Sequence, residues 1–256
     1  MKRFAAVFLS LLFFIPAASA DPLPLAGEDL TDTITVFYNG EDDSDGRYVW
    51  SCRYPVIADE NDLSAVCINE YYRKKVQEYN AFYAPSQAQA YAGQYQNVTI
   101  GVSYEITCNN DDCFSVLLHR TEDVEGEVSE IWEGNTFSRK SEMIGSVTSL
   151  PALLGLVDDG ESDEWLGNRQ SGKVCEVLRS LVWEAVLENP EGIDYLPGLK
   201  EEDLESVIDP DISPDQDYYI NADGDVVFFV LPGRIAPPDA GLITFTFTME
   251  ELQDEL

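Results

Sequence analysis

The most informative stretch of the sequence reads Val98-Thr-Ile-Gly-Val-Ser-Tyr-Glu-Ile-Thr-Cys108-Asn-Asn-Asp-Asp-Cys113-Phe-Ser-Val-Leu-Leu-His-Arg120. Two runs rich in β-branched, aromatic and other apolar residues flank the four polar residues 109–112, which are of the types that favour turns. The pattern predicts a β-hairpin whose arms are residues 96–108 and 113–122.

Cys108 and Cys113 stand at the two ends of the predicted turn, where the arms of a hairpin lie opposite each other. We therefore expect a disulfide bond between them. Cys52, Cys67 and Cys175 remain, so a second bond would leave one thiol whose identity the sequence does not decide. We expect no metal site, because the sequence contains no CxxC pair and a single His.

The regions on both sides of the hairpin alternate between strand and helix patterns. An amphipathic helix is predicted from Asp62 to just before Pro85, because apolar and aromatic residues recur there at spacings of three and four, namely Ile68, Tyr72, Val76, Tyr79 and Tyr83. Ser171 is predicted to cap a second helix that Asn189-Pro190 ends. A short acidic helix is expected near residues 201–207. Further strands are predicted over residues 32–38, 47–57, 126–137, 217–220, 225–231 and 242–248.

Hairpins dominate this order, and βαβ crossovers do not. The expected fold class is α+β, with antiparallel sheets, helices packed on one face, and two intimately associated halves. We place the halves at residues 21–145 and 146–256.

Residues 1–20 have the pattern of an export signal peptide. Lys2 and Arg3 precede an apolar run, and Ala18-Ser-Ala20 is typical of a cleavage site, so we expect Asp21 to become the mature N-terminus. The apolar run is shorter than the roughly 20 residues of a spanning helix, which argues against an uncleaved anchor. We expect no membrane span after signal cleavage and an extracytoplasmic location, secreted or periplasmic, where disulfides can form.

Acidic residues dominate the charge of the chain: 48 Asp and Glu oppose 15 Lys and Arg, for a formal net charge of −33. Nucleic acids and anionic membranes require a basic surface, so neither is expected as a partner. The acidity has two explanations, namely solubility after export or attraction of a cationic partner. One charge run in a predicted loop is the candidate for part of a partner-binding surface, although such runs often only face water. It consists of Asp158, Asp159, Glu161, Asp163 and Glu164.

A search for catalytic chemistry finds no nucleophile elbow, phosphate-binding glycine loop or zinc signature. His119, the single histidine, lies in a predicted strand without a Ser or Cys motif around it, and we expect a surface or interface role. Carboxylate pairs are too abundant to locate the acid and base of a glycosidase. Residues 221–225 lack the spacing of a calcium loop and favour a hairpin turn. We expect no catalytic residues, no metal and no cofactor.

Residues 217–245 contain an aromatic strand pattern, a glycine turn, a second aromatic pattern, then Ile235-Ala-Pro237 leading to Ala240-Gly241 and a last strand. This order resembles the C-terminal domain of the RsiV-type anti-sigma factors, whose extracellular domain senses lysozyme. The residues that fit the family pattern are Tyr218, Tyr219, Gly224, Phe228, Phe229, Ile235, Ala236, Pro237, Ala240, Gly241 and Phe245.

Upstream, Tyr54-Pro55 followed by Ile68-Asn69 in a predicted helix is similar to the N-terminal portion of the same family, which is shared with the accessory domain of PdaC-type peptidoglycan deacetylases. The resemblance implies a PdaC-accessory-like half, residues 21–145, and an RsiV-like half, residues 146–256. The family's Gly-Gly-Ala-His type segment is replaced by Val124-Glu-Gly-Glu-Val128. We find neither the cytoplasmic segment nor the membrane helix of an anti-sigma factor, so we do not expect this chain to pass a signal inward.

The resemblance implies a surface that binds an exported protein such as a lysozyme, or cell-wall glycan (peptidoglycan), rather than an active site. Lysozymes are often strongly basic, and an acidic binder gains association rate from electrostatic steering. We therefore expect a non-catalytic binding protein. The main alternative is an enzyme, or an accessory module of one, that acts on cell-wall polysaccharide. A structural envelope protein is the third hypothesis.

Overall fold

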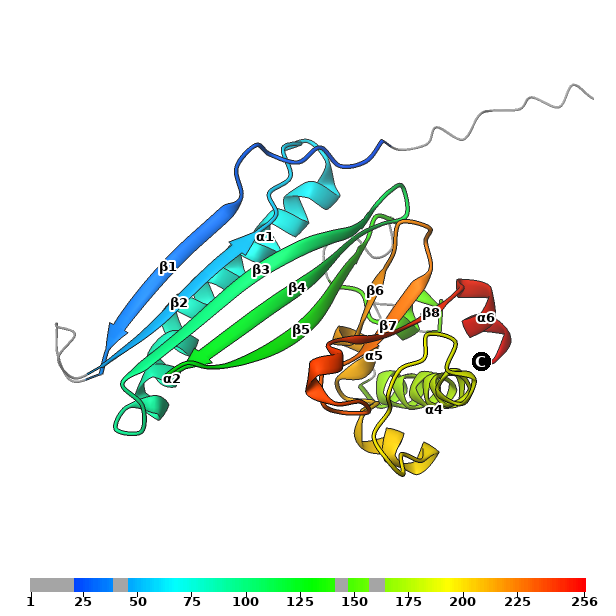
Figure 1. The fold of residues 1–256 in the computed structure, drawn as a ribbon. Helices are drawn as coiled ribbons and strands as arrows, with labels where there is room; N and C mark the ends of the chain where they lie inside the picture. The colour runs from blue at the N-terminus through cyan, green and yellow to red at the C-terminus, as the bar shows by residue number, and fades with distance from the viewer. Residues whose placement is uncertain (1–20, 39–45, 141–146, 157–163) are drawn as a thin grey trace, which may run out of the picture.

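The computed structural model describes residues 21–38, 46–140, 147–156 and 164–256. These residues form an α+β fold with two sheets, which confirms the expected fold class (Figure 1). The larger sheet has the order β1 (Leu30–Phe37), β2 (Arg47–Tyr54), β3 (Asn97–Asn109), β4 (Cys113–Val124) and β5 (Glu127–Ser138). The smaller sheet has the order β6 (Tyr218–Ile220), β7 (Val226–Val230) and β8 (Ile243–Phe247).

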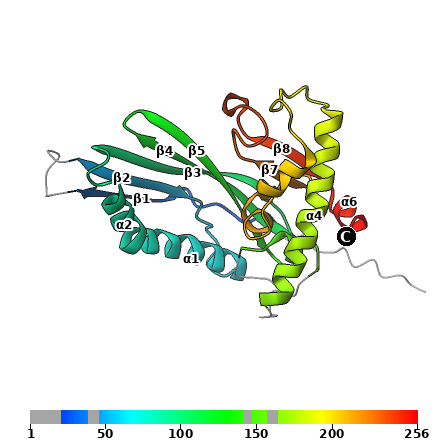
Figure 2. The ribbon, with the colours of Figure 1, turned by 90° about the horizontal axis from the view of Figure 1, so that it is seen from below.

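The helices that cover the larger sheet lie along one of its faces, as expected (Figure 2). They are α1 (Leu63–Glu78), the π-helical turn η2 (Tyr79–Tyr83) and α2 (Ala84–Tyr91). The long helix α4 (Glu164–Glu188) belongs to the C-terminal half. The short helices are α3 (Leu150–Leu153), η3 (Glu201–Ser206), α5 (Ser213–Gln216), η4 (Pro238–Ala240) and α6 (Met249–Asp254).

Neighbouring strands pair antiparallel, with the exception of β2 and β3, which are parallel. A parallel pair needs a crossover connection, and α1 with α2 provides it. The sequence predicted antiparallel sheets, because hairpin patterns dominate the order of the elements. That prediction is wrong for β2 and β3. The long β3–β4 hairpin agrees with the prediction, with Tyr104 opposite Leu118 in the register.

The first helix does not end before Pro85, and that prediction is wrong. The backbone instead makes one wide π-helical turn, in which the N–H of Ala84 donates to the carbonyl of Tyr79. Pro85 then lies in the first turn of α2, directly after this wide turn. The polypeptide is therefore helical from Leu63 to Tyr91.

The second long helix begins upstream of its predicted N-cap. Ser171 lies within α4, which starts at Glu164, because no proline interrupts the residues between them. The predicted end is confirmed: Asn189 has a φ of 41°, and its side-chain oxygen accepts a hydrogen bond from the N–H of Ile193 at 2.7 Å. This side chain ends the helix by satisfying the backbone of the following loop.

Buried apolar side chains form two clusters. The first lies between the larger sheet and α1, and includes Trp50, Tyr72 and Phe114. The second joins α4 to the smaller sheet through residues such as Leu178 and Phe228. Cys108 and Cys113 from the tip of the β3–β4 hairpin belong to this second cluster. The hairpin tip therefore takes part in the core of the C-terminal half.

The two halves meet where β6 lies against β5. The completely buried Ser115 Oγ accepts a hydrogen bond from the N–H of Ile220 at 3.0 Å and lies 2.8 Å from Thr136 Oγ1. Gly134 approaches β6 so closely that a Cβ atom there would lie 1.6 Å from the carbonyl oxygen of Tyr218. The contact is thus too close for any side chain at this position of β5.

Candidate binding surfaces

One end of the C-terminal half carries a concentration of negative charge. Eight acidic residues and no basic residue occur between positions 201 and 217. Glu201, Glu202 and Glu205 of η3 join Glu176 and Arg179 of α4 around a surface hollow of about 370 Å³. Four carboxylates and one guanidinium therefore surround this space, which we call the acidic hollow.

The acidic hollow is held by an apolar anchor and by backbone contacts. Leu204, in the middle of η3, is completely buried in the C-terminal core. Arg179 Nε donates to the carbonyl of Cys175 at 3.1 Å, and Arg234 donates to the carbonyl of Ser206 at 2.6 Å. Among the described residues, no ion pair neutralises the four glutamates. Their charge consequently faces solvent.

The predicted partner-binding run lies mostly outside the described residues. This applies to Asp158, Asp159, Glu161 and Asp163, whereas Glu164 is the first residue of α4. Sequence reasoning interpreted residues 201–207 only as a short acidic helix and missed the hollow. The signal was present in the run Glu-Glu-Asp-Leu-Glu at 201–205, but its proximity to α4 depends on the tertiary fold.

The turn between Cys108 and Cys113 is stabilised by Asn110. The N–H of Asn110 donates to the carbonyl of Cys113 at 3.0 Å, and its side-chain oxygen accepts from the N–H groups of Asp112 and Cys113 at 2.9 and 3.0 Å. Both cysteines are buried free thiols in this structure. The hydrogen bond between them lowers the pKa of Cys108 and, together with burial, raises the pKa of Cys113. The disulfide stays a prediction.

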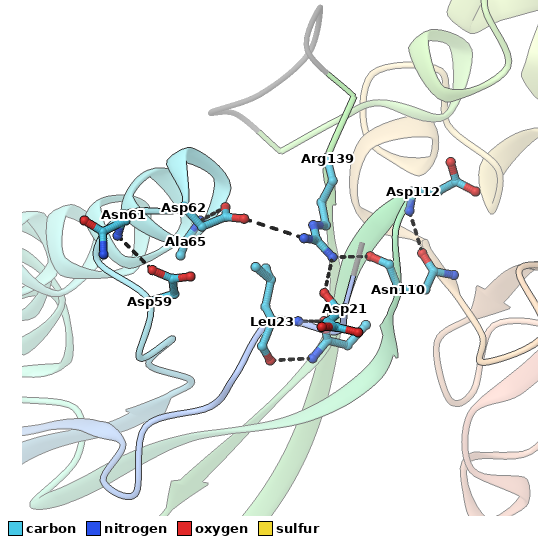
Figure 3. Close-up of polar contacts among 10 residues, drawn as sticks. Asp21, Leu23, Asp59, Asn61, Asp62, Ala65, Asn110, Asp112 and Arg139 are labelled. Atoms are coloured by element: carbon cyan, nitrogen blue, oxygen red, sulfur yellow. Dashed lines mark hydrogen bonds and ion pairs between the residues drawn. The ribbon is translucent and has the colours of Figure 1, made fainter. Parts of the chain in front are cut away.

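Arg139 ties this turn to the start of the described chain and to the start of α1 (Figure 3). Its Nη1 donates to the carbonyls of Asn110 and Asp21 at 2.6 and 3.2 Å, and its Nη2 lies 3.6 Å from a carboxylate oxygen of Asp62. The Arg139 side chain is only 7% exposed. One buried guanidinium thus connects three segments that are far apart in the sequence.

His119 forms a stack on the face of the larger sheet opposite α1. Its ring lies 4.0 Å from that of Trp132, centroid to centroid, with an interplanar angle of 14°. Its Nε2 lies 3.6 Å from a carboxylate oxygen of Glu130. Ser103 is opposite His119 in the register, but its hydroxyl donates to the backbone carbonyl of His119 at 3.5 Å. The hydroxyl is therefore directed at the backbone rather than at the imidazole.

A cavity of about 490 Å³ lies beside the π-helical turn η2, and we call it the tyrosine cavity. It combines aromatic rings with charged and polar groups. The lining residues are Tyr71, Lys74, Lys75, Glu78, Tyr79, Tyr83, Gln87 and Arg120. Sequence reasoning missed this site, because it assigned Tyr79 and Tyr83 to the core stripe of the helix.

Hydrogen bonds hold two lining residues of the tyrosine cavity, Tyr79 and Gln87, in place. The hydroxyls of Tyr48 and Tyr79 lie 2.9 Å apart, and both donate to Gln87 Oε1, at 2.5 and 2.7 Å. The ring of Tyr79 stacks on Trp50 with a centroid distance of 4.2 Å. Burial raises the pKa of both tyrosines, so both hydroxyls stay protonated at neutral pH. The oxygen of Gln87 is used by these bonds, which leaves its amide N–H₂ for the cavity.

In the part of the chain that the structure describes, no group of three or more His, Cys, Asp or Glu side chains is arranged to hold a metal ion. Residues 221–225 form a hairpin turn, as predicted: Gly224 has a φ of 90°, and Asn221 Oδ1 accepts from the N–H groups of Asp223 and Asp225.

None of the helices in the described ranges is long and apolar enough to cross a bilayer.

Comparisons with known proteins give similarity at the level of the fold. A crystal structure of a DUF3298 family member from Bacteroides fragilis aligns with a TM-score of 0.51 and 14% identity, over 91% of this chain and 94% of that chain. A DUF3298 family protein from Pseudomonas aeruginosa aligns with a TM-score of 0.47 and 13% identity, over 91% and 93% of the two chains. No family profile and no curated protein matches the chain. The structural neighbours of this chain are thus DUF3298 family proteins, and the Bacteroides structure shares its overall fold.

Proposed function

We propose that this chain is an extracytoplasmic, non-catalytic binding protein that captures a cationic exported protein such as a lysozyme. The observation that carries the proposal is the acidic hollow, in which four glutamates lie around a single arginine, Arg179, and form no ion pair among the described residues. The four are Glu176, Glu201, Glu202 and Glu205. The export signal over residues 1–20 and the RsiV-like pattern over residues 217–245 support the same proposal.

The physical basis is electrostatic steering. A surface of one sign raises the local concentration of an oppositely charged protein and increases its association rate. The formal net charge of −33 provides the long-range field, and in the acidic hollow four carboxylates outnumber one guanidinium. Rim carboxylates of this kind contribute more to the association rate than to the lifetime of the complex.

The alternative is an enzyme or an enzyme-accessory module acting on cell-wall polysaccharide. The tyrosine cavity favours this candidate, because concave sites with aromatic walls and a few polar groups are typical of small-ligand sites. Incubation of the purified protein with peptidoglycan, followed by analysis of released or deacetylated sugars, separates the two functions. Turnover above background that survives repurification would replace the binding proposal with the enzymatic one.

Surface plasmon resonance against a cationic lysozyme tests the binding proposal directly. The immobilised protein is expected to bind the lysozyme saturably at low salt. A basic protein of similar charge and unrelated fold, such as a cytochrome c, is the control, and it should bind more weakly. Equal binding of the two basic proteins would reduce the interaction to nonspecific charge attraction, and no lysozyme binding would reject the partner.

A further inference from the structure

The tyrosine cavity is a second candidate site, and capture of a basic protein makes no use of it. It collects Lys74, Lys75 and Arg120 in a chain that has only 15 basic residues and a formal net charge of −33. Its volume of about 490 Å³ falls within the range of about 300–1,000 Å³ that is typical of small-molecule sites. Three basic groups and one carboxylate, that of Glu78, therefore lie beside aromatic rings, which distinguishes this pocket from the rest of an acidic protein.

The backbone beside the cavity has an unusual geometry. The π-helical turn η2 carries Phe82 and Tyr83, whose relative exposures are 69% and 56%. These aromatic side chains contribute little to the buried core, whereas Tyr79 of the same turn packs on Trp50. Single π-helical turns are rare within helices and occur frequently at functional sites. The turn directs Tyr83 to the cavity instead of the core.

Two of the cations retain the capacity to bind an anion. The Lys74 side chain is 70% exposed, and its pair with Glu78 at 3.7 Å is of the weak surface kind. Arg120 uses one Nη for Glu122 at 3.3 Å, and its buried Nε has no hydrogen-bond partner among the described residues. A guanidinium has five N–H donors, so Arg120 can bind a further acceptor in addition to Glu122.

Lys75 is engaged more fully. Its Nζ lies 2.5 Å from Glu133 and 5.7 Å from the centroid of the Tyr71 ring. Burial lowers the pKa of Lys75, but Glu133 and Tyr71 outweigh that effect and leave the pKa raised, so the ammonium stays charged. Lys75 is thus largely neutralised by Glu133, and Lys74 and Arg120 are the cations of the cavity that retain donors for a ligand.

We propose that the tyrosine cavity binds a sugar that carries a carboxylate. A sugar ring has apolar C–H faces and polar edges, which match the tyrosine rings and the amide of Gln87. The carboxylate would be held by Lys74 and Arg120, whose charge-assisted hydrogen bonds are the strong contacts of such a site. The proposal is independent of lysozyme capture, because it concerns a different surface and a ligand of opposite charge.

Isothermal titration calorimetry of the purified protein with matched sugars tests the proposal. N-acetylmuramic acid is compared with N-acetylglucosamine, which lacks the lactyl carboxylate, and glucuronic acid is compared with glucose. The charged member of each pair is expected to bind with a Kd about tenfold lower than that of its neutral counterpart. Preference confined to one pair identifies the source of the carboxylate, as muramic acid or as uronic acid.

Variants locate the site. Lys74→Gln should reduce the preference for the charged sugar, because it should raise the Kd of the charged sugar more than the Kd of the neutral one. Tyr83→Ala, at an exposed position where folding should be unaffected, should raise the Kd of both sugars several-fold. Lys200→Gln is the matched control, because Lys200 is exposed in the C-terminal half and should change neither value. Equal affinity of the unmodified protein for both members of each pair, no sugar binding, or an equal effect of Lys200→Gln would overturn the proposal.

Discussion

Replacing Gly134 by Ala tests the contact between the two halves of the fold. The new Cβ would lie 1.6 Å from the carbonyl oxygen and 2.7 Å from the carbonyl carbon of Tyr218. Ordinary contact begins at 3.4 Å, so β6 would have to withdraw by about 1.8 Å, the difference between 3.4 and 1.6 Å. The obstructing atoms are backbone, so rotation of a side chain cannot relieve the clash.

The cost follows from two effects. Overpacking a tight contact destabilises by about 1–3 kcal/mol. Withdrawal of β6 would also stretch the hydrogen bond from Ile220 N–H to Ser115 Oγ, and a buried donor without its acceptor costs about 1–3 kcal/mol. We therefore expect Gly134→Ala to lower the free energy of unfolding by about 3 kcal/mol, equivalent to a melting temperature lower by about 6–12 °C.

Urea unfolding followed by tryptophan fluorescence measures the change, and Gly172→Ala is the control. A Cβ at Gly172, inside α4, would meet nothing within 4 Å. Alanine is the better helix former by about 0.5–1 kcal/mol, so this variant should be more stable than the parent. If Gly134→Ala unfolds at the same urea concentration as the parent protein, the close packing of β6 on β5 is refuted.

Three further predictions concern Ser115, Asp217 and the two cysteines of the β3–β4 hairpin. Ser115→Ala should lower the free energy of unfolding in urea by about 1–3 kcal/mol, because the amide of Ile220 loses its acceptor. Ser103→Ala, at an exposed position of the same strand pair, should change that free energy by less than about 0.5 kcal/mol. Equal effects of the two variants would contradict the role of Ser115. Burial raises the pKa of Asp217, so its folded pKa exceeds the unfolded one and the ionised carboxylate is a penalty above both values. Asp217→Asn should therefore raise the melting temperature at pH 7, with a gain that disappears as the pH falls below about 3.9, and a gain that persists at pH 3 would argue against this cause. Cys108 and Cys113 should be found linked when the unreduced protein is mapped by peptide mass spectrometry, with a stabilisation near 2 kcal/mol because the closed loop is short, and recovery of both as free thiols would reject the bond.

Much of the fold follows from local patterns. The apolar runs around residues 109–112 define the β3–β4 hairpin, and Gly224 marks the turn between β6 and β7. Asn189-Pro190 marks the end of α4. In each case a turn residue lies at the end of a periodic apolar pattern, so the sequence carries two consistent signals.

Other features depend on contacts between distant segments. The parallel pairing of β2 with β3 requires the crossover helices to pack on the sheet, and no local signal distinguishes it from antiparallel pairing. The acidic hollow arises because Leu204 anchors η3 beside α4. Charge patterning along the chain reveals neither this anchor nor the excess of four glutamates over one arginine around the hollow.

The sequence does not reveal the tyrosine cavity, because the helical phase changes at the π-helical turn η2. Successive residues of an α-helix are rotated by about 100°, so Tyr72, Tyr79 and Tyr83 fall on one side of an ideal helix. The π-helical turn adds a residue to that turn and shifts the positions that follow it. Tyr72, which precedes the turn, is completely buried, whereas Tyr83, the last residue of the turn, is 56% exposed.

The association rate of a cationic lysozyme, measured by surface plasmon resonance at 0.1 M and 1 M salt, tests the central proposal most directly. The Debye length falls from about 10 Å to about 3 Å over this range, so the association rate should fall at least about tenfold while dissociation changes less. Replacing Glu201, Glu202 and Glu205 by Gln should slow association at 0.1 M salt several-fold more than replacing the exposed and dispersed Glu28, Glu60 and Glu127. Equal association rates for the two triple variants would contradict steering through the acidic hollow, and a salt-independent rate would contradict electrostatic capture itself.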